Sequence, residues 1–225
     1  MFESVNVIGR GRVGTAVAAR LEERGVEVRA SGAELDLLCV PDAAIAAVAG
    51  GLSPGHGWVG HVSGGTPLSA LDPHTRRFSV HPLQTFTLAR GPEQLDGAWA
   101  AVTAEIDEAL ERGFELAQTL GLRPFELPED DRAVYHAGAA IASNYLVTLY
   151  RAASELVEAA GAPPEALEPL MRRTIENGFE LTGPMARGDW ETVERHIEAI
   201  RARRPQLEPL YRILGDATEA LHALR

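Results

Sequence analysis

A glycine-rich turn near the N-terminus is the feature that most constrains how this chain folds. The segment Gly9-Arg10-Gly11-Arg12-Val13-Gly14 matches the pattern GxGxxG. It follows a β-branched run at residues 5–8, which predicts a strand, and apolar residues at helical spacing continue over residues 12–24. Because a strand, a glycine turn and a helix in this order form the first half of a βαβ unit, we predict a parallel sheet.

In that context each glycine of the turn has a role. Gly9 permits the tight turn, Gly11 lets a pyrophosphate approach the backbone, and Gly14 lets the helix pack on the strand. The phosphates would meet the N–H groups and the positive dipole end of the helix. A glycine turn without a ligand is the alternative. The predicted dinucleotide contacts come from the turn and from the end of the third strand, namely Gly9, Arg10, Gly11, Arg12, Val13, Gly14, Val40 and Pro41.

The end of the second strand indicates which dinucleotide is preferred. NAD sites place Asp or Glu there, whereas this chain has Arg29-Ala30-Ser31. Arg29 and Ser31, together with Arg10, would hold a 2′-phosphate by charge-assisted hydrogen bonds, so we expect NADP rather than NAD. The connection to the third strand is too short for a second crossover helix, which predicts an altered adenine side.

Strands and helices alternate up to residue 105, after which the pattern is helical and we expect no further strand. The expected strands cover residues 5–8, 26–29, 35–40, 58–62, 78–80 and 98–103. The expected helices cover residues 12–24, 43–49, 105–120, 132–160, 164–180, 190–203 and 205–224. The sequence thus predicts an α/β Rossmann-type doubly wound sheet over residues 1–124 and an all-α domain over residues 125–225.

Composition excludes several classes of chemistry. All 21 basic residues are arginine, so lysine acids, Schiff bases and P-loop lysines are absent. The net charge of −11 is shared by both halves, which argues against nucleic-acid binding. Cys39 lies in an apolar run and is expected to be buried and inert. Cys and His spacing fits no zinc site, and the longest apolar stretch is too short for a membrane span. We expect a cytoplasmic protein without metal.

Two of the later strands end in polar clusters, His61-Val62-Ser63-Gly64-Gly65 and Ser79-Val80-His81-Pro82-Leu83-Gln84-Thr85-Phe86, which should open into one crevice. Hydride transfer needs a nearby proton donor or acceptor, and without lysine His81 is the natural candidate. A surface or capping histidine is the alternative. Asp42 is expected to cap the following helix. We expect the remaining turn and helix-face histidines in solvent, namely His56, His74, His196 and His222.

The helical half offers two further sets of candidates. His136 and Asn144 lie two turns apart on a small-residue helix face, where a polar group is costly unless paired or liganded. An interhelical hydrogen bond is the alternative for Asn144. The loop that contains Arg187 would grip a carboxylate, or is a structural turn, and Asp189 is a candidate N-cap.

Taken in order, these motifs resemble Rossmann-like proteins with a DUF2520 C-terminal domain. The motifs are the glycine turn, Val40-Pro41-Asp42, Val62-Ser63-Gly64-Gly65, His81-Pro82-Leu83-Gln84-Thr85-Phe86, the helix 135–144 and Gly183-Pro184-Met185-Ala186-Arg187-Gly188-Asp189. Such proteins belong to the 6-phosphogluconate dehydrogenase-like superfamily, with pyrroline-5-carboxylate reductase, ketopantoate reductase and prephenate dehydrogenase. The resemblance implies NAD(P) binding and a helical domain that dimerises. The resemblance also implies a Lys/Asn pair one turn apart on the inter-domain helix. Asn144 matches the Asn of that pair, but Ala140 stands at the Lys position, which argues against a ketopantoate-reductase-like mechanism.

Two functions follow from these predictions. The first is an NADP-dependent oxidoreductase that transfers a hydride to or from a small carboxylate-bearing hydroxy/keto or amino/imino substrate. There His81 or His136 would handle the proton, Ser63 and Asn144 would orient the substrate, and Gly64 and Arg187 would bind it. The second is a non-catalytic NADP-binding sensor or scaffold. In either case we expect a homodimer through the helical domain.

Overall fold

The computed structural model describes residues 1–53, 55 and 57–223. Contacts within the chain divide it into two compact units, residues 1–141 and 142–225. The sequence pattern predicts a domain boundary between residues 124 and 125, which stays a prediction. We describe each unit by itself.

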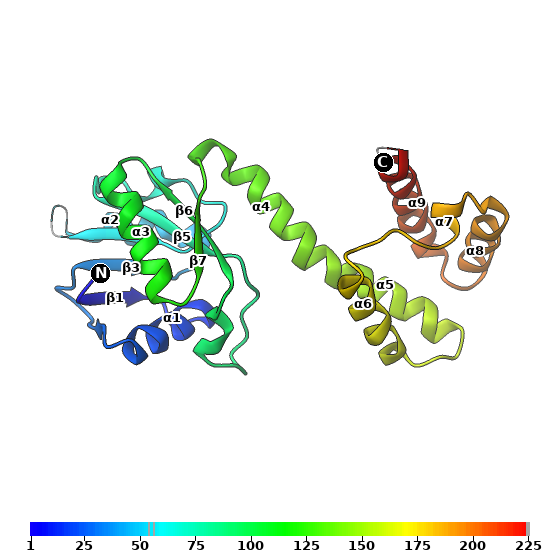
Figure 1. The fold of residues 1–225 in the computed structure, drawn as a ribbon, viewed down its shortest axis with the longest axis horizontal. Helices are drawn as coiled ribbons and strands as arrows, with labels where there is room; N and C mark the ends of the chain where they lie inside the picture. The colour runs from blue at the N-terminus through cyan, green and yellow to red at the C-terminus, as the bar shows by residue number, and fades with distance from the viewer. Residues whose placement is uncertain (54, 56, 224–225) are drawn as a thin grey trace. The chain divides into compact units, whose positions relative to one another are not determined.

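The first unit contains a seven-stranded sheet in the order β2-β1-β3-β4-β5-β6-β7 (Figure 1). All neighbouring strands are parallel except β5 and β6, which run antiparallel. The expected Rossmann-like α/β domain with a helical C-terminal region is therefore confirmed. The strands are β1 (Ser4–Ile8), β2 (Glu27–Val28), β3 (Leu35–Leu38), β4 (Trp58–His61), β5 (Arg77–Pro82), β6 (Trp99–Ala104) and β7 (Arg123–Glu126).

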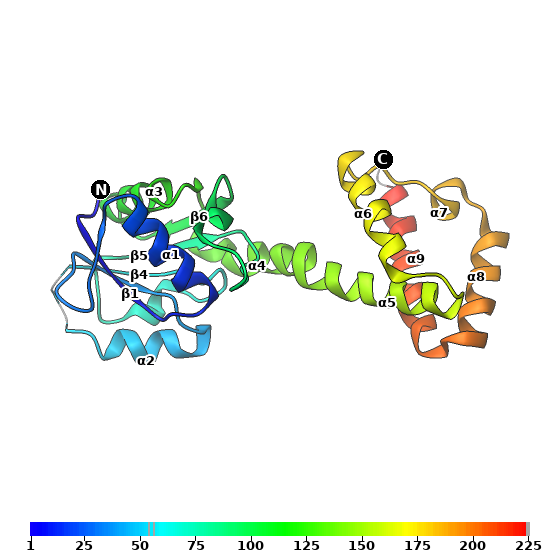
Figure 2. The same ribbon diagram turned by 90° about the horizontal axis from the view of Figure 1, so that it is seen from below.

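Helices cover both faces of this sheet because side chains of each strand alternate between the faces. In β3, Leu35 and Leu37 join the larger core, whereas Leu38 joins a smaller one. The larger core lies under α1 (Arg12–Glu23) and α3 (Asp107–Thr119), and the smaller under α2 (Ile45–Gly50) and the 3₁₀ turn η2 (Leu68–Leu71). Figure 2 shows α3 above the strands and α2 below them. Two helix layers leave the strand ends as the place for a site.

The link between β2 and β3 is as short as predicted, and residues 29–34 form no helix. β2 pairs only with Ser4 and Val5 at the beginning of β1. The Arg29 N–H donates to the Val5 carbonyl at 3.0 Å, and the Glu34 N–H donates to Ser4 Oγ at 3.2 Å. The loop therefore begins beside Val5 and ends beside Ser4, both in the early part of β1.

The expectation that no strand follows residue 105 is wrong, because β7 pairs in parallel with β6. Its sequence, Arg-Pro-Phe-Glu, contains a proline, which argues against a central strand. β7 is the edge of the sheet, where Pro124 is tolerated, and Phe125 packs edge-on against Trp99 at 6.2 Å. The strand leads through the 3₁₀ turn η4 (Glu129–Asp131) into α4 (Arg132–Ala140).

The helical segment predicted over residues 132–160 forms as α4, a π-helical turn η5 (Ile141–Tyr145) and α5 (Leu146–Ala159). The second unit continues with α6 (Leu167–Glu176), α7 (Pro184–Arg187), α8 (Trp190–Arg203) and α9 (Glu208–Ala223). Asp189 caps α8 as predicted, accepting from the Thr192 N–H at 3.2 Å. The last residue of the helix predicted over 205–224 lies outside the described residues. Among the helices described, none has the length and apolar character to cross a membrane.

Candidate active site

Polar side chains from three segments meet beyond the carboxyl ends of β4 and β5. The loop after β4 supplies Ser63 and two glycines, β5 supplies His81, and α4 supplies Tyr135 and His136. Because parallel strands end at one edge, this is where open α/β sheets bind ligands. All these residues belong to the first unit.

His81 is held by a hydrogen bond and by close packing. Its Nδ1 lies 2.8 Å from the Tyr135 hydroxyl, and the two rings meet edge to face with centroids 5.5 Å apart. Gly64 lies against the imidazole, since a Cβ there would stand 2.8–2.9 Å from three ring atoms. Burial, and then the charges of His136 and Arg132, lower the pKa of His81 to about 4. The imidazole is therefore neutral at physiological pH.

His136 is the exposed neighbour of His81. The two rings lie at 87° with centroids 6.1 Å apart. A Cβ on Gly65 would stand 2.8 Å from His136 Nδ1. Gly64 and Gly65 thus each leave room for one imidazole, and the structure brings together the two histidines that the sequence offered as alternatives.

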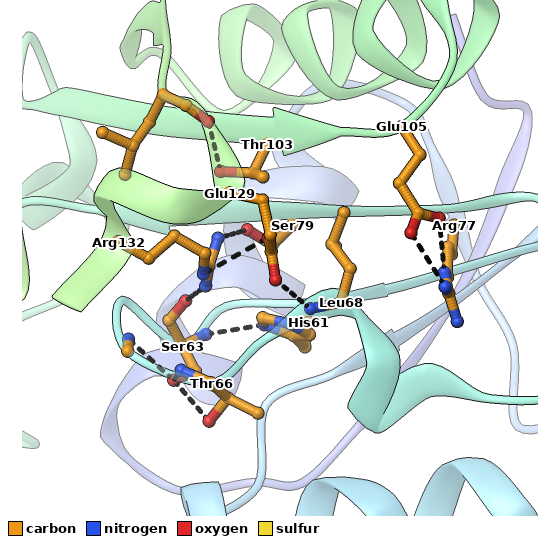
Figure 3. Close-up of polar contacts among 12 residues, drawn as sticks. His61, Ser63, Thr66, Leu68, Arg77, Ser79, Thr103, Glu105, Glu129 and Arg132 are labelled. Atoms are coloured by element: carbon orange, nitrogen blue, oxygen red, sulfur yellow. Dashed lines mark hydrogen bonds and ion pairs between the residues drawn. The ribbon is translucent and has the colours of Figure 1, made fainter.

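A buried arginine at the start of α4 binds strand β5 and the loop after β4 (Figure 3). Arg132, only 3% exposed, donates from Nη1 to Ser79 Oγ at 2.5 Å and from Nη2 to the Ser63 carbonyl at 2.6 Å. Its Nε lies 3.9 Å from Oε2 of Glu129, whose Oε1 accepts from the Leu68 N–H at 2.8 Å. Arg132 thereby ties α4 to β5 and to the loop that follows β4.

The surroundings of Arg132 are polar but incompletely paired. Arg132 Nε, Glu129 Oε2 and His61 Nε2 are buried without a hydrogen-bond partner among the described residues. Burial, and then the charge of Arg132, lower the pKa of His61 to about 3. His61 Nδ1 accepts from the Ser63 N–H at 3.2 Å. Since His61 is fully buried, it supports the Ser63 loop and does not line an open crevice.

The glycine turn has the geometry that dinucleotide binding requires. A Cβ on Gly9 would stand 2.5 Å from the Cys39 carbonyl oxygen, and one on Gly14 would stand 2.0 Å from the Gly9 carbonyl oxygen. By contrast, nothing lies within 4 Å of a Cβ on Gly11. Gly11 also begins α1 without a side-chain cap, so the first N–H groups of α1 are available to an anion. The turn therefore fits a pyrophosphate.

The cations predicted to surround this turn are not all alike. Arg10 and Arg12 are exposed and form no ion pair with any described residue. Arg29 is paired with Glu27, with Nη2 2.5 Å from Oε2, and the charges of Glu34 and Glu3 also act on it. The register places Arg29 beside the early part of β1, three positions before Gly9, so the structure does not bring it to the glycine turn. Ser31 lies exposed in the same returning loop.

The other predicted site residues are distributed differently. The hydroxyl of Ser63 is engaged within its own turn, donating to Thr66 Oγ1 at 2.9 Å and accepting from the Thr66 N–H at 3.0 Å. Asn144, on η5, and Arg187, on α7, are exposed residues of the second unit. Val40 and Pro41 follow β3, next to the strand that carries the glycine turn.

Several smaller predictions are decided by burial and hydrogen bonds. Cys39 is buried as expected, which raises its thiol pKa to about 12. The prediction that His74 lies in solvent is wrong. It is buried, with Nε2 2.9 Å from the Ala49 carbonyl oxygen, because η2 places it against α2. Asp42 begins a 3₁₀ turn without capping through its side chain, so that prediction is also wrong. His196 is exposed as expected, whereas His56 and the side chain of His222 lie outside the described residues.

The sequence reasoning missed Arg132, Glu129 and Tyr135 as parts of this site. Glu129-Asp130-Asp131-Arg132 has the appearance of a solvated helix start, and nothing local indicates that Arg132 is buried. Tyr135 precedes His136 by one position, which places it about 100° around the helix from the face that the small residues define. These side chains enter the site only through the hydrogen bonds that the start of α4 makes with β5 and with the loop after β4.

The fold and site define a class, that of Rossmann-like proteins with a helical C-terminal region. The chain belongs to the DUF2520 family, described as a domain of unknown function, whose model matches residues 98–218. This match covers more than half of the 225 residues. Among curated proteins none matches the chain.

Solved structures with the same fold cover nearly the whole chain at low sequence identity. A Bacteroides fragilis protein, provisionally described as an NADP oxidoreductase, has a TM-score of 0.81 and 20% identity, covering 97% of this chain and 98% of its own. A Thermotoga maritima protein has a TM-score of 0.78, 22% identity and coverages of 97% and 98%. A Streptomyces aurantiacus imine reductase has a TM-score of 0.66, 15% identity and coverages of 96% and 93%. At these identities the likeness concerns the fold.

Proposed function

We propose that this chain is a nicotinamide-dependent oxidoreductase that prefers NADP and acts on a small carbonyl or imine compound or its reduced form. The observation that carries the proposal is one shared edge. The open glycine turn follows β1, and the cluster of His81, Tyr135 and His136 lies at the carboxyl end of β5. These two strands are three strand spacings apart in the sheet, which is roughly 14 Å. The fold neighbours described as reductases support the same conclusion.

Within this proposal the bound cofactor supplies or accepts a hydride, and the chain provides binding and proton transfer. Gly11 and the N-terminus of α1 receive the pyrophosphate, while Val40 and Pro41 border it. His81 contacts the reacting group through Nε2, because Nδ1 already bonds Tyr135. The imidazole of His136 lies beside that of His81 and is the second candidate for proton transfer. Ser63 shapes the loop rather than presenting its hydroxyl.

The NADP preference rests on Arg10. Its guanidinium is exposed beside the glycine turn and has no acidic partner among the described residues, so it remains available to a 2′-phosphate. Arg29 contributes less in this view because Glu27 already neutralises it. Ser31 lies on the same loop as Arg29 and shares its position. A carboxylate on the substrate, and a role for Asn144 or Arg187 in holding it, remain part of the proposal.

The test is His81→Asn, with His196→Asn as the matched control. Turnover of a panel of keto and imino acids with NADPH should fall about 10²–10⁴-fold in the first variant, while NADPH affinity stays nearly unchanged. His196 forms a similar pair with Tyr211 in the helical unit, so its variant should retain full turnover. Unchanged turnover in His81→Asn would remove His81 from the reaction. NADPH binding without any turnover would favour the sensor or scaffold.

We also propose a homodimer through the helical unit. No residue of α5 or α6 is buried, and both helices carry large exposed apolar side chains. Leu170 is 62% exposed and Leu146 41% exposed, and an extensive exposed apolar surface is typical of a protein–protein interface. Replacing Leu146 and Leu170 by Asp should convert a dimer to a monomer in sedimentation velocity. A wild-type monomer at micromolar concentration would contradict this.

A further inference from the structure

The hydrogen bond between Tyr135 and His81 assigns a direction to the proposed chemistry. We propose that Tyr135 donates its hydroxyl hydrogen to His81 Nδ1, so that the imidazole carries its proton on Nε2 and meets a carbonyl or neutral imine as a hydrogen-bond donor. The site is then set for reduction. Tyr135 is a positioning residue in this scheme. The chemical consequence rests on the proposed function, whereas the position of the imidazole proton is a property of the chain alone.

Acidity decides which partner donates. The Tyr135 oxygen and His81 Nδ1 are 2.8 Å apart, an ordinary hydrogen-bond distance. Burial raises the pKa of the Tyr135 hydroxyl to about 12, yet a phenol remains a stronger acid than the N–H of a neutral imidazole, and the imidazole nitrogen is the stronger base. The O–H···N arrangement is therefore the better bond. A neutral imidazole has a single N–H, which must then be on Nε2.

The surroundings keep His81 neutral and hold its ring in place. Burial, and then the charges of His136 and Arg132, disfavour a second proton on the imidazole. Gly64 leaves no free space beneath the ring, and the Tyr135 ring stands at 86° to it. His81 Nε2 has no hydrogen-bond partner among the described residues and is the ring nitrogen left for a ligand.

The proton transfer balances with a dihydronicotinamide as the hydride donor. When the substrate carbon accepts the hydride, the electron pair of the C=O or C=N bond moves to the heteroatom, which takes the Nε2 proton. His81 Nδ1 takes the hydroxyl proton of Tyr135 at the same time, so the imidazole stays neutral. Burial raises the pKa of Tyr135 to about 12, and the charge of Arg132 lowers it, so the phenolate is transient. Solvent then supplies a proton to Nε2 and the Nδ1 proton returns to the Tyr135 oxygen, which restores the starting tautomer. A protonated iminium, which has no lone pair, would not be recognised.

Nitrogen chemical shifts of histidine test this without any turnover. In protein labelled with ¹⁵N-histidine, long-range proton–nitrogen spectra distinguish the two neutral tautomers, and the signals lost in His81→Asn identify His81. We expect the Nε2–H form in the wild-type chain and a mixture of tautomers in Tyr135→Phe. The chain offers a matched control: Tyr211 lies 2.8 Å from His196 Nδ1 with the rings at 87°, so Tyr211→Phe removes an equivalent hydroxyl.

Kinetics supply the second readout. Tyr135→Phe should lower kcat for a keto or imino substrate by at least about tenfold with unchanged NADPH affinity, while Tyr211→Phe retains full activity. An Nδ1–H form in the wild-type chain, or an unaltered tautomer in Tyr135→Phe, would overturn the inference even if the enzyme reduces substrates. Conversely, the Nε2–H form in a chain that turns over nothing would refute the proposed function and leave the role of Tyr135 standing.

Discussion

Adding one methyl group at Gly64 tests how tightly the His81 ring is held. A Cβ there would stand 2.8–2.9 Å from Cε1, Nδ1 and Nε2, about 0.7 Å closer than ordinary heavy-atom contacts. The backbone of Gly64 is outside the left-handed region, so the strain is purely steric. To make room, the imidazole must move and lengthen its bond to Tyr135. Overpacking costs about 1–3 kcal/mol, and the hydrogen bond adds about 1 kcal/mol.

Gly65→Ala is the matched control one position along the chain. Its Cβ would also approach an imidazole, His136 Nδ1 at 2.8 Å, but His136 is exposed and its side chain can rotate away. Urea unfolding followed by tryptophan fluorescence should therefore show a loss of about 2–4 kcal/mol for Gly64→Ala and less than about 1 kcal/mol for Gly65→Ala. Equal losses in the two variants, or none in Gly64→Ala, would show that the His81 ring is not confined as described.

Two further predictions concern charge. Arg10→Gln should raise the Kd for NADPH by about tenfold or more and leave the Kd for NADH unchanged in a fluorescence titration, because the lost cation serves the 2′-phosphate; an equal effect on both would assign Arg10 to the pyrophosphate. Acidification should destabilise the fold. The pKa values of His61 and His81 are about 3 and about 4 in the folded chain, against 6.5 in the unfolded chain. Below pH 6.5 the unfolded chain therefore binds more protons than the folded chain. The contribution of the two histidines to the free energy of unfolding is therefore fully present above pH 6.5. It falls toward pH 4 by roughly 1 kcal/mol per pH unit for each histidine, and the fall should be less steep in His81→Asn.

The mostly parallel sheet and its glycine turn were predictable because local patterns specify them. Continuous apolar runs such as residues 37–40 occur in strands covered on both faces, and the glycine spacing has one structural context. Strand β7 was not predicted because Pro124 is acceptable only at a sheet edge, and the edge position is a property of the whole sheet. Similarly, the burial of His74 depends on η2 packing against α2, which no local pattern around His74 reveals.

The candidate site was predictable in part. His81 follows from the chemistry that hydride transfer needs and from its position at the end of a strand. Arg132 and Tyr135 did not follow, because their roles depend on how α4 packs against strands more than 50 residues earlier in the chain. The register of β2 likewise determines that Arg29 stops short of the glycine turn and meets Glu27. Long-range packing of this kind leaves no signature in residue spacing.

The central claim, a nicotinamide dinucleotide at the glycine turn, is tested most directly by titrating wild-type protein and Gly11→Val with NADPH. Nothing lies within 4 Å of a Cβ at Gly11, so valine should leave the fold and its unfolding midpoint unchanged while it fills the space for the pyrophosphate. We expect saturable NADPH binding to the wild-type chain, tighter than that of NADH, and a loss of at least about 100-fold in affinity in the variant. Equal binding by Gly11→Val, or no binding by the wild-type chain, would contradict the claim.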